Sequence, residues 1–430
     1  MKLFYQLSLT IVLTIAVGGS VKSADEPSYI FLSAPSVKDN YYRPKFDELI
    51  HFYDGFIKRA APGDVPVVVA DAATIAEIGN RLPRRNLLEG NARDVWVRDS
   101  GVIQTTAGIF KTQFRPAYLS ASDAKYIEDG FLSWFRGLQF PFEHIDIKLD
   151  GGNFCHNEGN RAVTTQRVLD DNPGVSEAQL KNLAHSKMGI TELAILPEEA
   201  GDTTGHADGM IKWLAPNKIA LNNYTNRTFK TQVTQVLEEA FPGIEIVSMP
   251  WNPTRRYWRS FADGTGIYVN AMTTPNAIYV PVYGLASDPG ALEVFRAHAD
   301  RRVIPVKVSP DIAVMGGAAR CLSCQVSGAP AAQALVPGAG RPSVLIQSPR
   351  IGKKVGRRIL VSGIARDADG ISDVRFAVGN KTGRARLRKT TGKWWFTLRP
   401  DRRKRNTLVR VYAFDKPGSI GFKTRKFRTR

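Results

Sequence analysis

Four short segments carry side chains that could do chemistry together. They are Trp96–Asp99, Asp150–Asn153, Gly205–Asp208 and Gly316–Cys321. They supply carboxylates, a histidine and a late cysteine, each beside glycines or an aromatic residue. A nucleophile, a proton donor and acceptor, and two anions suit an attack on a cationic carbon. The guanidinium group of arginine is the obvious candidate for that cation.

Each of four residues can be given a task in such a reaction. The carboxylates of Asp99 and Asp208 can bind the N–H groups of a guanidinium in a fork, which holds it still and keeps it charged. Cys321 supplies a thiolate, and a bound cation nearby lowers the pKa of that thiol. His206 can give a proton to the leaving ammonia and later take one from the hydrolytic water.

The elements that must position these residues form a repeating pattern. Apolar β-branched runs predict strands, and helical spacing of apolar residues predicts helices, often with two strands between them. The predicted strands include 65–69, 210–213, 219–221, 244–247, 266–270, 277–282 and 303–308, and the predicted helices include 126–138, 178–188, 233–241 and 292–299. A strand–strand–helix–strand unit that recurs about every 50–70 residues is typical of a module repeated around an axis. We therefore expect loops from different modules to converge on one central site.

Residues 1–24 have the composition of a secretory signal peptide. Lys2 precedes a mostly apolar run over 3–17, and the small residues Ser23 and Ala24 follow. This order predicts a soluble mature protein that is secreted, periplasmic or held at the cell surface, with an uncleaved anchor as the alternative. No later stretch is long and apolar enough to cross a bilayer, so we expect no transmembrane segment in the mature chain.

Length and charge divide the rest of the chain. About 400 residues are too many for one compact core and indicate two or more domains. Residues 341–430 contain 26 Lys and Arg against 5 Asp and Glu, whereas residues 1–340 contain 33 against 35. The small, Pro/Gly-rich stretch 331–342 is typical of a linker. We predict a mixed α/β domain over 25–330 and a basic all-β domain over 343–430.

The basic domain is predicted to be an immunoglobulin-like β-sandwich. Short strands are expected at 343–346, 358–361, 374–377, 394–398 and 408–413, with Trp395 in the core. Two clusters of like charge, 384–389 and 402–405, are unfavourable unless a polyanion neutralises them. The predicted partner is an anionic cell-envelope polymer or extracellular nucleic acid. Solvated strands that only aid solubility are the alternative.

Three cysteines allow at most one internal disulfide. A bond between Cys155 and Cys324 would leave Cys321 free, and the sequence alone leaves this pairing open. A structural zinc site would need a second C-x-x-C, and no calcium-loop pattern is visible. We expect neither a metal nor another cofactor.

In their order along the chain, these motifs resemble the guanidino-group-modifying superfamily, in the branch that holds agmatine deiminases and bacterial, Porphyromonas-type peptidylarginine deiminases. The matching segments are Trp96–Asp99 with Gly101, Gly151–Asn153, Gly205–Asp208, Tyr268-x-Asn270 and Gly316–Cys321.

The resemblance implies a fold and a set of roles. The fold is a five-bladed α/β propeller, which agrees with the repeated module. The roles make Cys321 the nucleophile, His206 the acid and base, and Asp99 and Asp208 the guanidinium clamp. The resemblance also implies that Asn270 lines the pocket and that Trp96 forms its wall.

The chain departs from the family pattern at two positions. Arg320 stands where a histidine usually precedes the nucleophile, and Cys324 stands where a glutamine is common. If the Arg320 side chain turns inward, its cation further lowers the pKa of Cys321. These departures leave open a second class of function, in which the propeller binds arginine without turnover and the basic domain does the biological work.

A signal peptide with an appended domain resembles the exported peptidylarginine type more than the intracellular agmatine deiminases. The predicted substrates are therefore peptides or proteins with arginine, at the C-terminus, converted to citrulline and ammonia. A free carboxylate needs a cation, and Arg115 is the candidate, with Arg255, Arg256 and Arg259 as rivals. Deimination of agmatine to N-carbamoylputrescine is the alternative.

Overall fold

The computed structural model describes residues 28–138, 140–251, 254, 256–328, 342–349, 354–355, 358–367, 370–378, 381–400, 406–415 and 420–429. The predicted leader (1–24) and nearly all of the predicted linker lie outside these ranges. Within the described ranges, no helix is long and apolar enough to cross a membrane.

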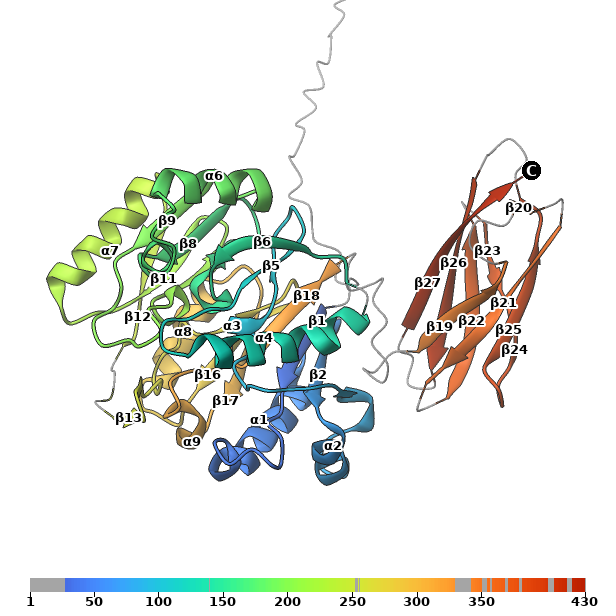
Figure 1. Cartoon of the computed structure of the whole chain (residues 1–430), viewed down its shortest axis with the longest axis horizontal. Coiled ribbons are helices and arrows are strands. Elements are labelled where there is room, and N and C mark those ends of the chain that lie inside the picture. Colours follow the sequence, from blue (N-terminus) through green and yellow to red (C-terminus); the bar gives the residue numbers. More distant parts are fainter. Residues whose placement is uncertain are drawn as a thin grey trace, which may run out of the picture.

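The part before residue 329 is a mixed α/β structure in which one module recurs (Figure 1). In four three-stranded sheets an antiparallel pair is followed by a parallel partner, with a helix before the third strand. The strands of these sheets are β4 (Ile103–Gln104), β5 (Ile109–Gln113) and β6 (Glu143–Lys148); β7 (Cys155–His156), β8 (Arg161–Thr165) and β9 (Glu192–Leu196); β10 (Ile211–Ala215), β11 (Lys218–Asn222) and β12 (Glu245–Met249); β15 (Met272–Thr273), β16 (Ala277–Val282) and β17 (Arg302–Lys307). A separate short hairpin joins β13 (Tyr257–Trp258) and β14 (Phe261–Ala262).

A fifth, four-stranded sheet joins the two ends of this part. Its strands are β1 (Ser28–Ser33), β2 (Asp64–Ala70), β3 (Leu87–Glu89) and β18 (Ser323–Ser327), in the order β18-β1-β2-β3. The last strand, β18, pairs antiparallel with the first, so that Phe31 lies opposite Cys324. The loop that carries Cys321 is thereby fixed against the start of the chain.

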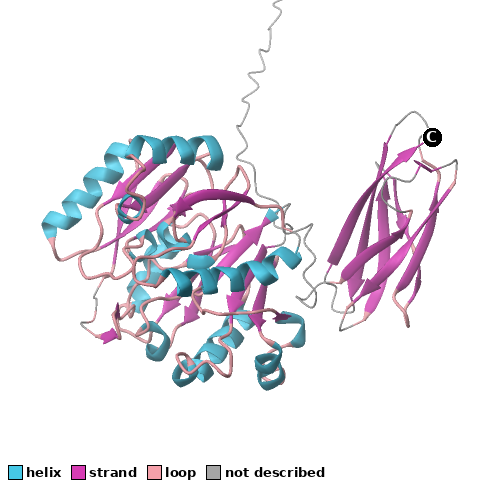
Figure 2. Ribbon diagram, in the orientation of Figure 1, coloured by secondary structure: helices cyan, strands magenta, loops and turns pink. Residues whose placement is uncertain are grey.

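The helices lie around the outside of this part and the strands lie within it (Figure 2). They are α1 (Phe46–Arg59), α2 (Ala72–Ile78), α3 (Val97–Ser100), α4 (Ala121–Phe135), α5 (Arg167–Asp170), α6 (Glu177–Met188), α7 (Arg227–Ala240), α8 (Asp288–His298) and α9 (Pro310–Ala313). Each long helix turns an apolar face inward, as α1 does with Leu49, Tyr53 and Phe56, because residues three and four apart share one face. The helix α6 shows why the boundaries fall where they do: it begins with a capping box at Ser176 and ends at Gly189 with φ +70°.

The predicted elements of this part are confirmed with one exception. The expected strand at 266–270 is wrong, because these residues form turns and the short strand β15 begins only at Met272. In this turn the Asn270 side chain faces the Cys321 loop, where it donates a hydrogen bond to the sulfur and accepts one from the backbone N–H of Cys321.

The part after residue 341 is all-β in the described residues. One sheet has the order β19-β21-β25-β24 and the other β20-β27-β26-β22-β23, and both contribute to one apolar core. The strands are β19 (Ser343–Ser348), β20 (Lys354–Val355), β21 (Ile359–Arg366), β22 (Ile371–Val378), β23 (Lys381–Arg384), β24 (Arg386–Arg388), β25 (Lys393–Leu398), β26 (Asn406–Asp415) and β27 (Ile420–Thr429). The five predicted strands coincide with β19, β21, β22, β25 and β26.

The predicted core tryptophan of this part is wrong by one residue. Trp394 is the buried side chain, together with Phe396 and Leu398, whereas Trp395 is partly exposed. Side chains alternate between the faces of a strand, so the apolar set of β25 is the even-numbered one. The Trp–Trp pair offered no local signal to choose between the two faces.

Candidate active site

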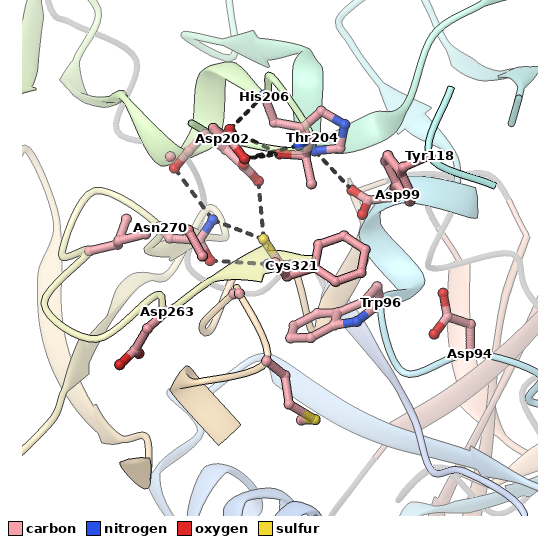
Figure 3. Close-up of a pocket in the computed structure, with 18 of the residues that line it drawn as sticks. Asp94, Trp96, Asp99, Tyr118, Asp202, Thr204, His206, Asp263, Asn270 and Cys321 are labelled. Carbon is pink, nitrogen blue, oxygen red and sulfur yellow. Dashed lines mark hydrogen bonds and ion pairs between the residues drawn. The ribbon is translucent and has the colours of Figure 1, made fainter. Parts of the chain in front are cut away.

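Six of the seven predicted site residues line one cavity of about 460 Å³ (Figure 3). They are Trp96, Asp99, His206, Asp208, Asn270 and Cys321. They come from helix α3, from the loops before β10 and β15, and from the turn before β18. Segments more than 200 residues apart in sequence therefore meet at this cavity.

Glycines make this convergence sterically feasible. A Cβ on Gly152 would lie 2.5 Å from Asp99 Oδ1 and 2.5 Å from His206 Nδ1, and one on Gly317 would lie 2.6 Å from the Trp96 ring. Gly316 has φ +105°, a conformation that side chains other than glycine rarely adopt. The Gly-Gly pairs of the sequence motifs are thus sites of close approach around the reactive groups.

Asn270 holds the cysteine loop through its side-chain amide. Its Nδ2 donates to Cys321 Sγ at 3.0 Å, while its Oδ1 accepts from the backbone N–H groups of Cys321 and Ala318, each at 3.2 Å. Its backbone carbonyl accepts from Arg320 N at 3.0 Å. One side chain therefore fixes both the sulfur and the backbone around it.

Arg320 turns inward and engages Asp208. Its Nη1 lies 2.5 Å from Asp208 Oδ2 and 3.1 Å from the carbonyl of Gly152, and its Nη2 donates to the carbonyls of Gly151 and Phe154 at 3.3 and 2.8 Å. The same Asp208 oxygen lies 3.7 Å from Cys321 Sγ. One oxygen of this carboxylate is thus committed to a protein cation beside the sulfur.

His206 lies between two carboxylates. Its Nε2 is 3.2 Å from Asp150 Oδ2, and its Nδ1 is 3.6 Å from Asp99 Oδ1. Burial alone would lower the pKa of His206, but Asp99, Asp150 and Asp208 together raise that pKa to about 10. The imidazole is therefore protonated at neutral pH and can donate a proton.

Burial favours the protonated form of Asp99. Burial raises the pKa of Asp99 to about 7, with Asp150 and Asp208 adding to the rise against the opposing charge of His206. Asp99 Oδ1 is buried without a hydrogen-bond partner among the described residues. A cation placed here could donate a hydrogen bond to Asp99 Oδ1, which has only the longer ion pair with His206 Nδ1 at 3.6 Å among the described residues.

The pKa of Cys321 is raised well above its usual value. Burial is the largest cause, and the carboxylates of Asp208 and Asp99 add to it, whereas Asn270 and Arg320 oppose it. Arg320 lowers the pKa of Cys321, as expected, but burial and the two carboxylates outweigh this effect. Within the protein alone, the sulfur is therefore a thiol, not a thiolate.

Arg115, the seventh predicted residue, is placed elsewhere. It does not line the cavity, and its Nη1 lies 2.8 Å from Glu128 Oε2. Among its rivals, Arg255 lies outside the described residues, Arg256 pairs with Asp263 at 2.6 Å, and Arg259 stacks on Tyr41 with its Cζ 4.2 Å from the ring centre. Arg115, Arg256 and Arg259 therefore do not line the cavity in which a substrate carboxylate would be held.

The sequence interpretation missed two residues of this site. Asp150 orients His206, and its place directly before the Gly-Gly pair was the available signal. Arg93 is the only lysine or arginine among the described residues that line the cavity, where its Cζ lies 4.0 Å from the Tyr126 ring centre. Nothing in its local sequence distinguished Arg93 from other surface arginines.

The Cys155–Cys324 disulfide, which the sequence left open, is not formed, since all three cysteines are free. Cys324 Sγ contacts the carbonyl of Val102, and Cys155 Sγ contacts that of Gly152. The described residues contain no cluster of three His, Cys, Asp or Glu side chains suited to a metal ion.

Comparison with known proteins relates this site to deiminases. Putative agmatine deiminases from Mycoplasma capricolum and Vibrio parahaemolyticus are each 23% identical, over 56% and 41% of this chain and 79% and 58% of their own lengths. The structure of C. jejuni agmatine deiminase matches with a TM-score of 0.59 at 20% identity, covering 70% of this chain and 93% of that one. A putative arginine deiminase from Porphyromonas gingivalis matches with a TM-score of 0.57 at 19% identity, covering 70% and 96%.

The family model for Porphyromonas-type peptidyl-arginine deiminases matches residues 23–327, which include the whole cavity. The chain therefore belongs to this family and is an enzyme that hydrolyses a guanidino group.

Proposed function

We propose that Cys321, His206, Asp99 and Asp208 carry out deimination of a guanidinium compound in the 460 Å³ cavity. The observation that carries the proposal is their convergence, with Cys321 Sγ 3.7 Å from Asp208 and 3.0 Å from the Asn270 amide. Family membership together with this complete set supports turnover over the alternative of a module that only binds arginine.

The reaction is two displacements at one carbon. The Cys321 thiolate adds to the guanidinium carbon while Asp99 and Asp208 hold its N–H groups, and the C–N bond to a terminal nitrogen breaks. That nitrogen leaves as ammonia with the proton of the His206 imidazolium. Neutral His206 then takes a proton from water, whose oxygen adds to the thiouronium carbon, and the thiolate is released with a ureido product.

Substrate binding itself activates the nucleophile in this scheme. The carboxylates that raise the pKa of Cys321 are those that would clamp the guanidinium. A bound cation offsets their charge, so the thiol loses its proton when the substrate arrives. Arg320 supports this step because it keeps one oxygen of Asp208 neutralised beside the sulfur.

The charge of the cavity favours a substrate with a second positive group, such as agmatine. Eight carboxylates line the cavity, against one arginine: Asp39, Asp94, Asp99, Asp123, Glu199, Asp202, Asp208 and Asp263. Burial raises the pKa of Asp94 to about 6 and that of Glu199 to about 7, so a cationic amine near either one would gain a charged partner. The name of the Mycoplasma capricolum relative, a putative agmatine deiminase, points the same way.

Peptide arginine with a free C-terminal carboxylate is the second candidate. This substrate needs a cation at the cavity, and Arg115 does not supply one because it is bound to Glu128. Arg93 lines the cavity and donates from Nη1 to the Tyr126 carbonyl at 2.8 Å. Its other donors have no hydrogen-bond partner among the described residues and could bind a carboxylate.

A substrate panel with two variants tests these proposals. Ureido product should form from agmatine faster than from a peptide ending in arginine, the same peptide with internal arginine, or free arginine. Cys321→Ala should abolish turnover, and the control Cys155→Ala should retain it. Preference for the peptide ending in arginine would replace agmatine with peptide arginine as the proposed substrate. In that case Arg93→Gln should raise the KM for this peptide, whereas the control Arg136→Gln should not.

We also propose that the five sheets before residue 329 are the blades of an α/β propeller within a domain over 25–330, and that an immunoglobulin-like domain over 343–430 follows the linker 331–342. The repeated sheet order supports the former, and two sheets around a common core support the latter. We further propose that residues 1–24 direct export and that the basic domain binds an anionic polymer.

A further inference from the structure

A second, smaller cavity is lined by cationic side chains. Its volume is about 50 Å³, and its wall comes from α3, β7, β10, β18 and the loops around them. Arg320 contributes to this wall and is also the partner of Asp208 in the first cavity. The mechanism above uses no other residue of this second cavity.

The charges of this cavity do not balance. Its lining includes four cationic side chains, Arg98, Lys212, Arg301 and Arg320, and one carboxylate, Glu158. Arg320 pairs with Asp208, and Arg301 pairs with Glu158 at 2.8 Å and with Asp300 at 2.7 Å. Arg98 and Lys212 form no ion pair with any described residue. Carboxylates act on these two buried cations only from a longer distance, Asp208 and Asp99 on Arg98 and Glu158 on Lys212. A buried cation without a direct ion pair costs free energy.

Hydrogen-bond donors in the wall are also left without acceptors. Arg98 is 4% exposed, and its Nε is buried without a partner among the described residues, while its Nη2 donates to Gln325. Lys212 is 8% exposed and gives one N–H to the Ala271 carbonyl at 2.6 Å. The hydroxyl of Thr273 is likewise buried without a described partner.

A histidine adds one more donor. Its ring nitrogen Nδ1 accepts from the backbone N–H of Glu158 at 3.1 Å, so neutral His156 carries its hydrogen on Nε2. Burial lowers the pKa of His156 to about 4, with nearby cations contributing, which keeps the ring neutral. The cavity therefore offers donors and positive charge, the opposite of the acidic first cavity.

The titration of the buried cations fits this imbalance. Burial, and after it the neighbouring Arg320, lower the pKa of Lys212 to about 7. Burial and Arg320 also lower the pKa of Arg98. A negative charge in the cavity would reverse both effects and restore the ordinary charged state of Lys212.

We propose that this cavity binds a small monovalent inorganic anion of the size of chloride, held by Arg98, Lys212 and Arg320. About 10–15 Å³ of cavity volume suffices for one water molecule, so this cavity of about 50 Å³ has room for a chloride ion but not for an organic anion of the size of gluconate. Because Arg320 lines this site and pairs with Asp208, the anion lies behind the active site without entering it.

Thermal unfolding of Cys321→Ala tests anion binding without reference to turnover. We expect the Tm to rise with sodium chloride and to stay constant in sodium gluconate of equal ionic strength, because only the smaller anion fits and stabilises the folded state by mass action. Lys212→Met should abolish this difference. Lys218→Met, which alters a surface lysine paired with Glu245, should keep it.

Diffraction from crystals grown in sodium bromide locates the ion directly, and this measurement decides the matter if Lys212→Met does not fold. We expect an anomalous peak within hydrogen-bond distance of Arg98 and Lys212. Equal Tm values in chloride and gluconate, or no bromide peak in this cavity, would overturn the proposal. Neither result depends on which guanidinium compound the enzyme uses, or on whether it turns over.

Discussion

At the scale of single residues, the cavity is lined by more carboxylates than cationic side chains. Burial, and after it the neighbouring carboxylates, raise the pKa values of Asp99 and of the Cys321 thiol, which favours their protonated forms. Arg320 supplies a fixed cation to one of these carboxylates, where the family usually has a histidine. We therefore expect Arg320 to be a positioning residue that holds Asp208 beside the sulfur.

Arg320→Met should destabilise the fold markedly. The Arg320 and Asp208 side chains are 11% and 2% exposed, and removing one partner of a buried ion pair typically costs about 3–5 kcal/mol. Urea unfolding gives this free energy. The control Arg43→Met breaks an exposed pair with Glu77 and should cost less than about 1 kcal/mol. Equal losses for both variants would show that Arg320 does not secure Asp208.

The pH dependence of kcat/KM should have two limbs. Asp99, with its pKa raised to about 7, must be ionised to bind a guanidinium, so kcat/KM should rise with pH through this region. His206 must be protonated to release ammonia, so the value should fall as pH approaches about 10. A profile with agmatine measures both limbs, and an acidic limb unchanged in Asp99→Asn would contradict the assignment.

Asn270→Ala should lower kcat by about 10–1000-fold, the range of losses seen when a group that orients a reactive side chain or stabilises an oxyanion is removed. The amide donates to the Cys321 sulfur and accepts from two backbone N–H groups of the same loop. Steady-state kinetics with agmatine measures the loss. The iodoacetamide alkylation rate of Cys321 should also change, which a purely remote packing defect would not produce. An unaltered kcat would remove Asn270 from the site.

At the scale of elements, the glycine motifs determine how closely the site can assemble. The 3-10 turn Gly151–Asn153 carries Gly152 into the space between Asp99 and His206, where any side chain would clash. The strand β18 then holds the Cys321 loop against β1. These contacts link the start, middle and end of the α/β part.

Gly152→Ala should reduce activity strongly while the fold is retained. The added Cβ would lie 2.5 Å from atoms of both Asp99 and His206, so these side chains must shift. The matched control is Gly174→Ala, where a Cβ would meet nothing within 4 Å. Circular dichroism and kcat, measured for both variants, separate the two effects; full activity of Gly152→Ala would refute the steric argument.

Local patterns explain which elements the sequence could predict. Strands such as β2 and helices such as α6 have strong periodicity and caps, and they were predicted at nearly correct positions. The segment 266–270 looked like a strand because it is apolar, but its tertiary contacts with the Cys321 loop decide its turn conformation. The prediction placed Trp395 in the core in place of Trp394, because only the pairing of β25 with its neighbours decides which tryptophan faces inward.

The four residues of the proposed catalytic set could be located in the sequence for a different reason. Asp99, His206, Asp208 and Cys321 lie in short motifs with fixed spacing, whereas a carboxylate-binding arginine has no such motif. The sequence around Arg115 suggested a carboxylate-binding role. However, Glu128, which forms a buried ion pair with Lys111, also forms an ion pair with Arg115. Likewise, the cationic second cavity draws residues from α3 to β18 and has no trace in any one segment.

At the scale of the whole molecule, the net positive charge comes entirely from the part after residue 340, which has 26 basic against 5 acidic residues. Such a charge should attract polyanions in a salt-dependent way. The full chain is expected to bind double-stranded DNA more weakly as the salt concentration increases. The slope of log K against log salt concentration should be smaller for the double variant Arg386→Gln/Arg388→Gln. Fluorescence anisotropy measures this slope, and binding that ignores salt would exclude the electrostatic mechanism.

The proposed mechanism depends on a covalent bond between Cys321 Sγ and the guanidinium carbon. Rapid acid quenching during turnover of agmatine can trap this adduct. Mass spectrometry of the quenched protein should find the Cys321 peptide heavier by the substrate less one ammonia. The Cys321→Ala protein should show neither this adduct nor any product. Turnover of Cys321→Ala at the wild-type rate would contradict the account.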